Sequence, residues 1–283
     1  MAQLISKLRP RRFRLWRGAV LLIAGLYFLL PMAASVYFSI DDPKGFTFEA
    51  YTGLLNAPGF TDSLWLTLRL AVVTVLVLLL LLVPALIAVR LGSPRLRPVL
   101  EVVCTLPLVV PPVALTAGLI GVLRWGPDYL MDTPFFQTFV FVQDPQFPLV
   151  LVIAYVLMSL PLAYRALDAG LRAVDVRTLV EAARNCGASW PRAVFTVVLP
   201  NLRGALLNAS FLTLALVLGE FTAASILGYQ PFAVWIYSVG NSQAQMSVAV
   251  SVLSLLITWV LLLLLAAAGR ERRHRVPARP FSR

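Results

Sequence analysis

The 283-residue sequence is poor in the side chains that carry out most enzymatic chemistry. It has one histidine, His274, and two cysteines, Cys104 and Cys186, which lack C-x-x-C spacing. Two cysteines without such spacing predict neither a disulfide framework nor a metal site, and a lone histidine in a basic tail does not predict ligation. The apolar segments also lack any paired Ser, His or Asp, so an intramembrane enzyme is disfavoured.

A nucleotide-binding P-loop is absent as well. Such a loop needs Gly-Lys followed by Ser or Thr to hold phosphate groups, whereas the two lysines, Lys7 and Lys44, follow Ser6 and Pro43. If ATP drives the activity, a separate chain must bind it. We therefore expect this chain to bind no cofactor and no metal, with ATP and Mg²⁺ used by a partner.

Charged residues are scarce and unevenly placed. They make up 13% of the sequence, while hydrophobic residues make up 59%, against about half in ordinary soluble domains. The formal net charge is +11. A basic soluble protein would suggest nucleic acid as a partner, but here the basic residues flank long apolar runs. This arrangement favours a lipid bilayer as the partner, and no nucleic acid.

Six segments are long and apolar enough to cross a bilayer, which takes about 20 residues per helix. They are roughly 18–40, 64–90, 99–124, 149–167, 204–228 and 248–268. The first follows a basic stretch and contains Ala33-Ala34-Ser35, as a cleaved signal peptide can, but its apolar run continues to Ile40 and predicts an uncleaved helix. The sequence thus predicts an all-α integral membrane protein with six transmembrane helices.

The distribution of arginine predicts the orientation. With six spans, 21 of the 24 basic residues fall on one side of the membrane, and the other side holds seven carboxylates and very few cations. The positive-inside rule then places both termini in the cytoplasm. The predicted organisation is a basic tail (1–17), a first transmembrane helix with its outer loop (18–62), a transmembrane domain (63–268) and a second basic tail (269–283).

The connection between the fourth and fifth spans is polar and basic, and its pattern predicts two short helices. Asp175 is placed to cap the first helix, and Gly187 suits the left-handed residue that commonly ends one. Ser189 is placed to cap the second helix, with Pro191 in its first turn and Pro200 at its end. Apolar stripes are expected at Val176, Leu179, Val180 and Ala183, and again at Trp190, Val194 and Val197.

These amphipathic helices have two interpretations that spacing alone does not separate. They can lie on lipid as a surface linker, as basic amphipathic helices often do. They can also dock on another protein, since the small Ala182 and Ala183 permit close approach of a partner backbone.

The same connection contains Glu181-Ala182-Ala183, then Gly187 after three residues, then Val197, Leu199 and Pro200 after nine more. This pattern resembles the EAA loop of the permease subunits of type I ABC importers, which usually have Ile where Val197 stands. The resemblance extends over roughly residues 60–270. It implies the type I importer permease fold, with a five-helix core and a coupling loop at 168–200 that docks on an ATPase subunit.

The resemblance also implies partners, a location and a class of solute. The expected partners are two ABC ATPase subunits, a second permease copy or paralogue, and an extracytoplasmic solute-binding protein, in a bacterial cytoplasmic membrane. Leu218-Gly219-Glu220-Phe221 looks like the L-G-E-F segment of permeases for polyamines, ferric iron, sulfate and molybdate. The spermidine/putrescine-type branch is the nearest, so a polyamine-like solute is expected.

Several residues are candidates for the translocation pathway. Pro107 and Pro111 should bend the third span, either as a packing kink or as part of the path. Glu220 is the one carboxylate well inside a span, where an ionisable side chain suggests function, although a structural, paired glutamate is the alternative. Thr213, Thr222 and Ser225 follow at nearly helical intervals and can share its face.

Two further features stay open on sequence grounds. The outer segment 125–148 is too polar and proline-rich to span, and is either a folded surface loop or part of a docking face. An ion-coupled secondary transporter is the alternative function. That class tends to show inverted repeats and broken helices at matched positions, and the sequence has no such repeat.

Overall fold

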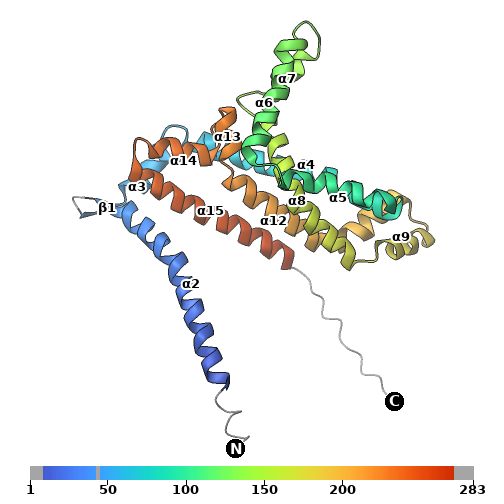
Figure 1. Ribbon diagram of the computed structural model, residues 1–283, viewed down its shortest axis with the longest axis horizontal. Coiled ribbons are helices and arrows are strands. Elements are labelled where there is room, and N and C mark those ends of the chain that lie inside the picture. The colour runs from blue at the N-terminus through green and yellow to red at the C-terminus, as the bar shows by residue number, and fades with distance from the viewer. Residues whose placement is uncertain (1–8, 43–44, 271–283) are drawn as a thin grey trace, which may run out of the picture. The chain divides into compact units, whose positions relative to one another are not determined.

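The structure, a computed structural model, describes residues 9–42 and 45–270 (Figure 1). Most of both predicted basic tails lies outside the described residues. The chain forms two compact units, one made of Met1–Pro58 with Ile236–Leu256 and the other of Gly59–Trp235 with Ile257–Arg283. Almost all of the described residues are helical, which confirms the all-α class apart from one short hairpin.

The six predicted spans correspond to four helices and two bent pairs. The four helices that are long and apolar enough to cross a bilayer are α2 (Arg9–Ile40), α4 (Phe60–Leu91), α8 (Leu149–Ala173) and α15 (Ala244–Arg270). The third and fifth spans are each broken, and counting each bent pair as one span brings the described residues to six.

The third span is an elbow. After the 3₁₀ turn η2 (Pro94–Leu96), α5 (Arg97–Thr105) and the 3₁₀ turn η3 (Leu106–Leu108) meet α6 (Pro112–Tyr129) at 102°. Pro111 is extended, with φ −58° and ψ 143°, and precedes a second proline. Because proline donates no backbone hydrogen bond and restricts the residue before it, the helix cannot continue here. The predicted bend of the third span at its prolines is confirmed, and it takes the form of a break between two helices.

The fifth span is broken at both ends. The helical segment Trp190–Asn201 meets α12 (Arg203–Gly219) at 71°. At the other end, Glu220 is extended, with φ −78° and ψ 124°, and a separate helix α13 (Thr222–Leu227) follows. One continuous helix over 204–228 was therefore wrong. The helix that contains Pro200 ends one residue beyond it, at the end of α11 (Leu199–Asn201).

The core of the second unit lies where α4, α8 and α12 pack together. Leu70 and Leu78 of α4, Ala154 and Leu167 of α8 and Ala209 of α12 are all buried there. At Gly170 of α8, an added Cβ would overlap the Cβ of Ala205 at the start of α12. Small residues allow this backbone approach, as they do in membrane helix pairs.

The predicted outer segment 125–148 is folded. It contains the end of α6 and a short helix α7 (Phe136–Val142), and together α6 and α7 form an arm that leaves the helical core (Figure 1). A Cβ at Gly126 would lie 2.9 Å from the side chain of Phe139, so the close packing of α6 on α7 depends on glycine at that position.

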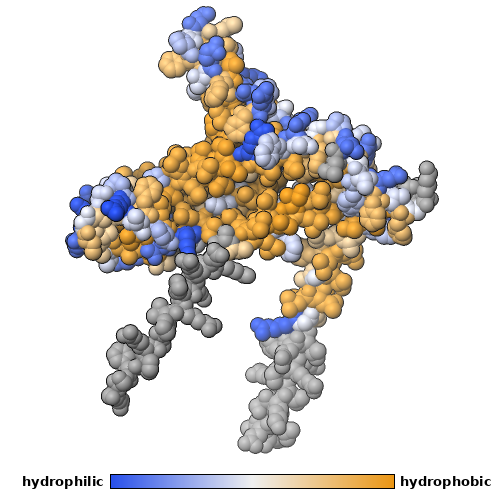
Figure 2. All heavy atoms as spheres, turned by 180° about the vertical axis from the view of Figure 1, so that it is seen from behind, coloured by the Kyte–Doolittle hydropathy of each residue, from blue (hydrophilic) through white to orange (hydrophobic). Residues whose placement is uncertain are grey.

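The first unit is built around α2. A two-stranded antiparallel hairpin, β1 (Asp41–Asp42) and β2 (Gly45–Phe46), leads to α3 (Glu49–Thr52) and the 3₁₀ turn η1 (Gly53–Asn56). The hydroxyls of Ser39 and Tyr51 are 2.7 Å apart and tie α2 to α3. None of the most apolar window of α2 is buried in the protein. Hydrophobic side chains form most of the visible surface (Figure 2), as expected for a protein surrounded by lipid.

Candidate coupling site

Helix α9 (Val176–Asn185) begins as the sequence predicts. The Asp175 carboxylate accepts hydrogen bonds from the Thr178 backbone N–H at 3.2 Å and from the Thr178 hydroxyl at 2.7 Å. These bonds favour the ionised form, so they hold the pKa of Asp175 below its usual value of 3.8. The prediction that Asp175 caps this helix is confirmed.

The two faces of α9 differ as predicted. Val176 and Val180 are buried against the core of the unit, with Ala183 packed beside them. Glu181 and Ala182 are exposed on the other face, where the Arg177 guanidinium lies 3.1 Å from the Glu181 carboxylate. An exposed ion pair of this kind contributes little to stability.

The end of α9 is a Schellman motif. Gly187 has φ +84° and donates its N–H to the Arg184 carbonyl at 2.9 Å, while Ala188 donates to the Ala183 carbonyl at 3.1 Å. A side chain at residue 187 would meet no neighbour within 4 Å. Glycine is therefore needed here for its backbone conformation, because a left-handed residue costs about 1–2 kcal/mol when a Cβ is present.

The second short helix departs from the prediction. It comprises α10 (Trp190–Ala193), a π-helical turn η4 (Val194–Val198) and α11. Ser189 precedes α10 without a side-chain capping bond to the described residues, and Trp190 is 45% exposed. The buried residues are Ala193, Val194 and Val198. Val198 is buried in place of the predicted Val197 because the π turn contains an extra residue, which rotates the face within it.

Pro200 accounts for part of this irregularity. It has no backbone N–H to donate to the carbonyl one turn earlier. The side-chain amide of the next residue, Asn201, donates to the Val197 carbonyl at 2.7 Å. Val197 and Leu199 are half-buried and Pro200 is exposed. The EAA-pattern residues thus lie on a single continuous segment, 176–201, which we call the coupling segment.

Beside the coupling segment is an apolar groove of about 450 Å³. One side is formed by α4, including Leu80 and Pro84, and the other by Trp190 and Phe195. Phe195 is 68% exposed and Leu80 is 74% exposed. Large apolar side chains so exposed indicate a surface that meets lipid or another protein.

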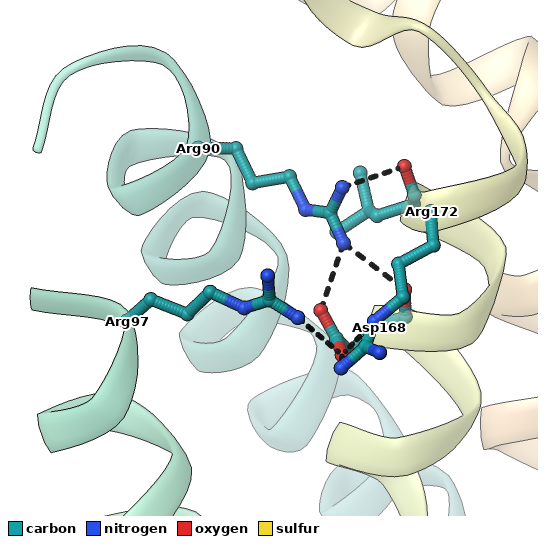
Figure 3. Close-up of polar contacts among 5 residues, drawn as sticks. Arg90, Arg97, Asp168 and Arg172 are labelled. Carbon is teal, nitrogen blue, oxygen red and sulfur yellow. Dashed lines mark hydrogen bonds and ion pairs between the residues drawn. The ribbon is translucent and has the colours of Figure 1, made fainter. Parts of the chain in front are cut away.

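A buried carboxylate near the end of α8 forms ion pairs with three arginines from three helices (Figure 3). The Asp168 carboxylate lies 2.8 Å from the Arg90 guanidinium at the end of α4, 3.5 Å from that of Arg97 at the start of α5 and 2.6 Å from that of Arg172 on α8 itself. Asp168 is only 5% exposed. Charge-assisted bonds of this kind are stronger than neutral ones. We call these four residues the Asp168 cluster.

Arg90 does more than neutralise charge. It also donates to the backbone carbonyls of Asp168 at 3.2 Å and Leu171 at 3.0 Å. Leu171 is among the last four residues of α8, whose carbonyls have no partner within the helix and carry partial negative charge, so Arg90 helps to close the C-terminus of α8. This cluster was not predicted from the sequence, although Asp168 is the one carboxylate between Leu149 and Ala173 and has Arg165 and Arg172 nearby in sequence.

Glu220, the carboxylate singled out from the sequence, lies in the break between α12 and α13. It is 7% exposed, and its carboxylate accepts from the N–H groups of Ala223 at 2.9 Å and Ala224 at 3.5 Å. The buried Tyr155 hydroxyl interacts electrostatically with it, without a hydrogen-bond partner in the described part of the chain. Glu220 therefore closes the N-terminus of α13.

The other pathway candidates are scattered. Thr213 is fully buried and its hydroxyl donates to the Ala209 carbonyl of its own helix at 2.9 Å. Thr222 is half-buried and Ser225 exposed, both beyond the break, so the three do not share one helical face. Pro107 is half-buried in η3 and Pro111 is exposed at the elbow.

The fold is that of a multi-pass membrane protein in which a polar helical segment connects two membrane spans. Residues 80–271 match the family described as binding-protein-dependent transport system inner membrane component, and the chain belongs to that family. It is therefore the membrane component of an ABC transporter, located in the inner membrane.

Relatives and solved structures agree with this family. The chain is 30% identical to a probable molybdenum ABC transporter permease of Haloferax volcanii over 80% of this chain and 78% of the relative. It is 26% identical to the spermidine/putrescine permease PotB of Haemophilus influenzae over 64% of this chain and 63% of the relative. A bacterial ABC transporter for the acidic polysaccharide alginate shares the fold, with a TM-score of 0.72, 17% identity and coverage of 95% of this chain and 98% of the other.

Proposed function

We propose that the chain forms the translocation path of an ATP-driven importer and that the coupling segment docks on a separate ATPase subunit. The observation that carries this proposal is the exposed face of α9. The apolar side of α9 is buried against the rest of the chain and is therefore not available to bind lipid. Glu181 and Ala182, on the opposite side of the helix, are exposed. This favours docking on a protein over the alternative of a linker lying on the membrane.

The assembly follows from the docking role. Both termini and the coupling segment face the cytoplasm, where two ATPase subunits bind ATP and Mg²⁺. A second permease, either a copy or a paralogue, completes the path, and a binding protein delivers the solute from outside. A related alginate transporter has been captured in complex with a periplasmic protein that carries an alginate pentasaccharide, which supports a delivery step of this kind.

The solute is a small one, with polyamines and molybdate as the two candidates. Similarity to the permease PotB supports a polyamine, and similarity to the Haloferax permease supports molybdate. The geometry of Glu220 weakens the case for a cation, because its carboxylate is already engaged by two backbone N–H groups. Ferric iron and sulfate are further candidates, because residues 218–221 also resemble the L-G-E-F segment of permeases for these solutes.

The test replaces the glycine that ends α9. Gly187→Val should leave membrane insertion intact, because the space around residue 187 is open, while the strained backbone misplaces the coupling segment. We expect ATP-dependent uptake to fall on the order of tenfold, which corresponds to a rise of about 1.4 kcal/mol in the barrier of the transport cycle. Uptake is measured with radiolabelled spermidine and molybdate in parallel, in vesicles that contain the whole transporter.

Gly204→Val is the matched control. Gly204 also has open space around it, but its φ is not positive, so valine there should leave uptake close to normal. Normal uptake by Gly187→Val would contradict the coupling role. Uptake without an ATPase that collapses with the ion gradient would instead favour an ion-coupled secondary transporter.

A further inference from the structure

The end of α8 is connected to the coupling segment with almost no intervening chain. Helix α8 ends at Ala173 and α9 begins at Val176, so only two residues separate them. Asp168 lies within the last turns of α8 and is buried. Any displacement of α9 therefore acts on the part of α8 that carries Asp168, and whatever is attached to Asp168 moves with it.

Two other helices are attached there. Arg90 joins the end of α4 to α8 through the Asp168 carboxylate and through two backbone carbonyls. Arg97, the first residue of α5, reaches the other oxygen of the same carboxylate at 3.5 Å. Figure 3 shows these side chains converging from neighbouring helices on Asp168. Arg172 comes from α8 itself and holds the carboxylate in place at 2.6 Å.

The attachment of α5 has a consequence for the elbow. Helix α5 is nine residues long and leads through η3 into the 102° bend before α6. A short helix moves as a rigid body, so a shift of its first residue changes the position of its last. Pro107 and Pro111, both candidates for the pathway, lie at that far end.

We propose that Asp168 is a positioning residue that transmits displacement of the coupling segment to α5, and through α5 to the elbow between α5 and α6. This inference rests on the proposed function, because it needs a force applied to α9. Arg97 carries the link to α5, while Arg90 and Arg172 keep the carboxylate neutralised when that link is broken.

The test removes the link and leaves the carboxylate paired. Arg97→Gln deletes the ion pair to α5, and Arg95→Gln is the matched control. Arg95 lies two residues earlier in η2 and forms no ion pair within the described ranges. The reporter is Val109→Cys at the elbow, where the native side chain is 82% exposed, in a Cys186→Ser background because Cys186 is also exposed.

The measurement is the rate of maleimide labelling of residue 109 in the whole complex, with and without ATP and Mg²⁺. With Arg97 present, the nucleotide should change the labelling rate. Arg97→Gln should reduce that change about threefold, as loss of a half-exposed ion pair would. Arg95→Gln should keep the full change, and Arg97→Lys should recover part of it because the cation remains.

Three outcomes would overturn the proposal: a full nucleotide-dependent change in Arg97→Gln, no change even with Arg97 present, or failure of Arg97→Gln alone to assemble, which would make the link merely structural. The uptake test at Gly187 separates the two proposals. If Gly187→Val loses uptake while Arg97→Gln keeps the full change, only the role of Asp168 is withdrawn. If Gly187→Val has normal uptake, the coupling role falls, and the role of Asp168 falls with it.

Discussion

Asp168 and Glu220 are two buried acidic side chains in the same unit, 5% and 7% exposed, that are held by different kinds of partner. Asp168 is surrounded by guanidinium groups from three helices. Glu220 is held by backbone N–H groups of the helix that follows it. The first carboxylate joins segments that are distant in sequence, whereas the second closes a break within one predicted span.

Because their partners differ, substitution of the two carboxylates should have different effects on stability. Removal of a carboxylate from three cations leaves positive charges that repel one another near the protein interior. Removal of a helix cap leaves only neutral N–H groups without a partner. The joint at Asp168 should therefore be more sensitive to mutation than the break at Glu220.

The largest expected effect is at Asp168. Asp168→Leu should destabilise the protein by roughly 3 kcal/mol, the lower end of the range for breaking a buried ion pair, since the arginines are partly exposed. Thermal unfolding in detergent measures this loss. Arg172→Leu is the comparison, because it leaves the carboxylate paired with Arg90 and Arg97 and should cost much less. Equal costs for the two variants would refute the central place of Asp168 in the cluster.

A smaller effect is expected at Glu220. Glu220→Ala removes the cap of α13 and should cost about 1 kcal/mol, while Glu220→Gln keeps an acceptor and should cost less. Uptake and unfolding are measured on the same preparations. A fall in uptake by Glu220→Gln much larger than its loss of stability would support a place in the pathway. A stable protein with unchanged uptake would leave Glu220 as a helix cap alone.

The smallest effect is a pH dependence at Asp175. Its folded-state pKa is lowered by the Thr178 hydroxyl and N–H, so its contribution is fully present above the unfolded value near 3.8 and is lost as the pH falls through the lower folded value. Proteolysis of the coupling segment across this range reports the loss. Asp175→Asn keeps a neutral cap and should remove the pH dependence, so an unaltered profile would assign it to another group.

The positions of the spans and the caps of α9 could be predicted from sequence because both depend on local pattern. A run of apolar residues, an aspartate before a helix and a glycine after it are all visible within one or two turns. The buried stripe of α9 follows from the same periodicity. These features need no knowledge of what lies beside the helix.

The breaks and the Asp168 cluster depend on contacts that local pattern does not contain. Helix α12 ends at Glu220 because the Glu220 carboxylate accepts hydrogen bonds from Ala223 and Ala224, both beyond the break. An apolar run in the sequence does not reveal these bonds. Arg90 and Arg97 are far from Asp168 in sequence and meet it only because α4, α5 and α8 pack together. The π turn at Val194–Val198 is similarly hidden, and within it the buried residue is Val198 and not the predicted Val197.

The contact between Gly170 and Ala205 has a consequence for any force that reaches the coupling segment. These residues belong to the helices on either side of that segment, and the Gly170 backbone lies so close to the Ala205 side chain that there is no room for one more carbon atom. The helices at the two ends of the coupling segment, α8 and α12, are thus packed directly against each other. A force on the coupling segment cannot tilt α8 while α12 stays still, so the two helices must move together as one rigid body.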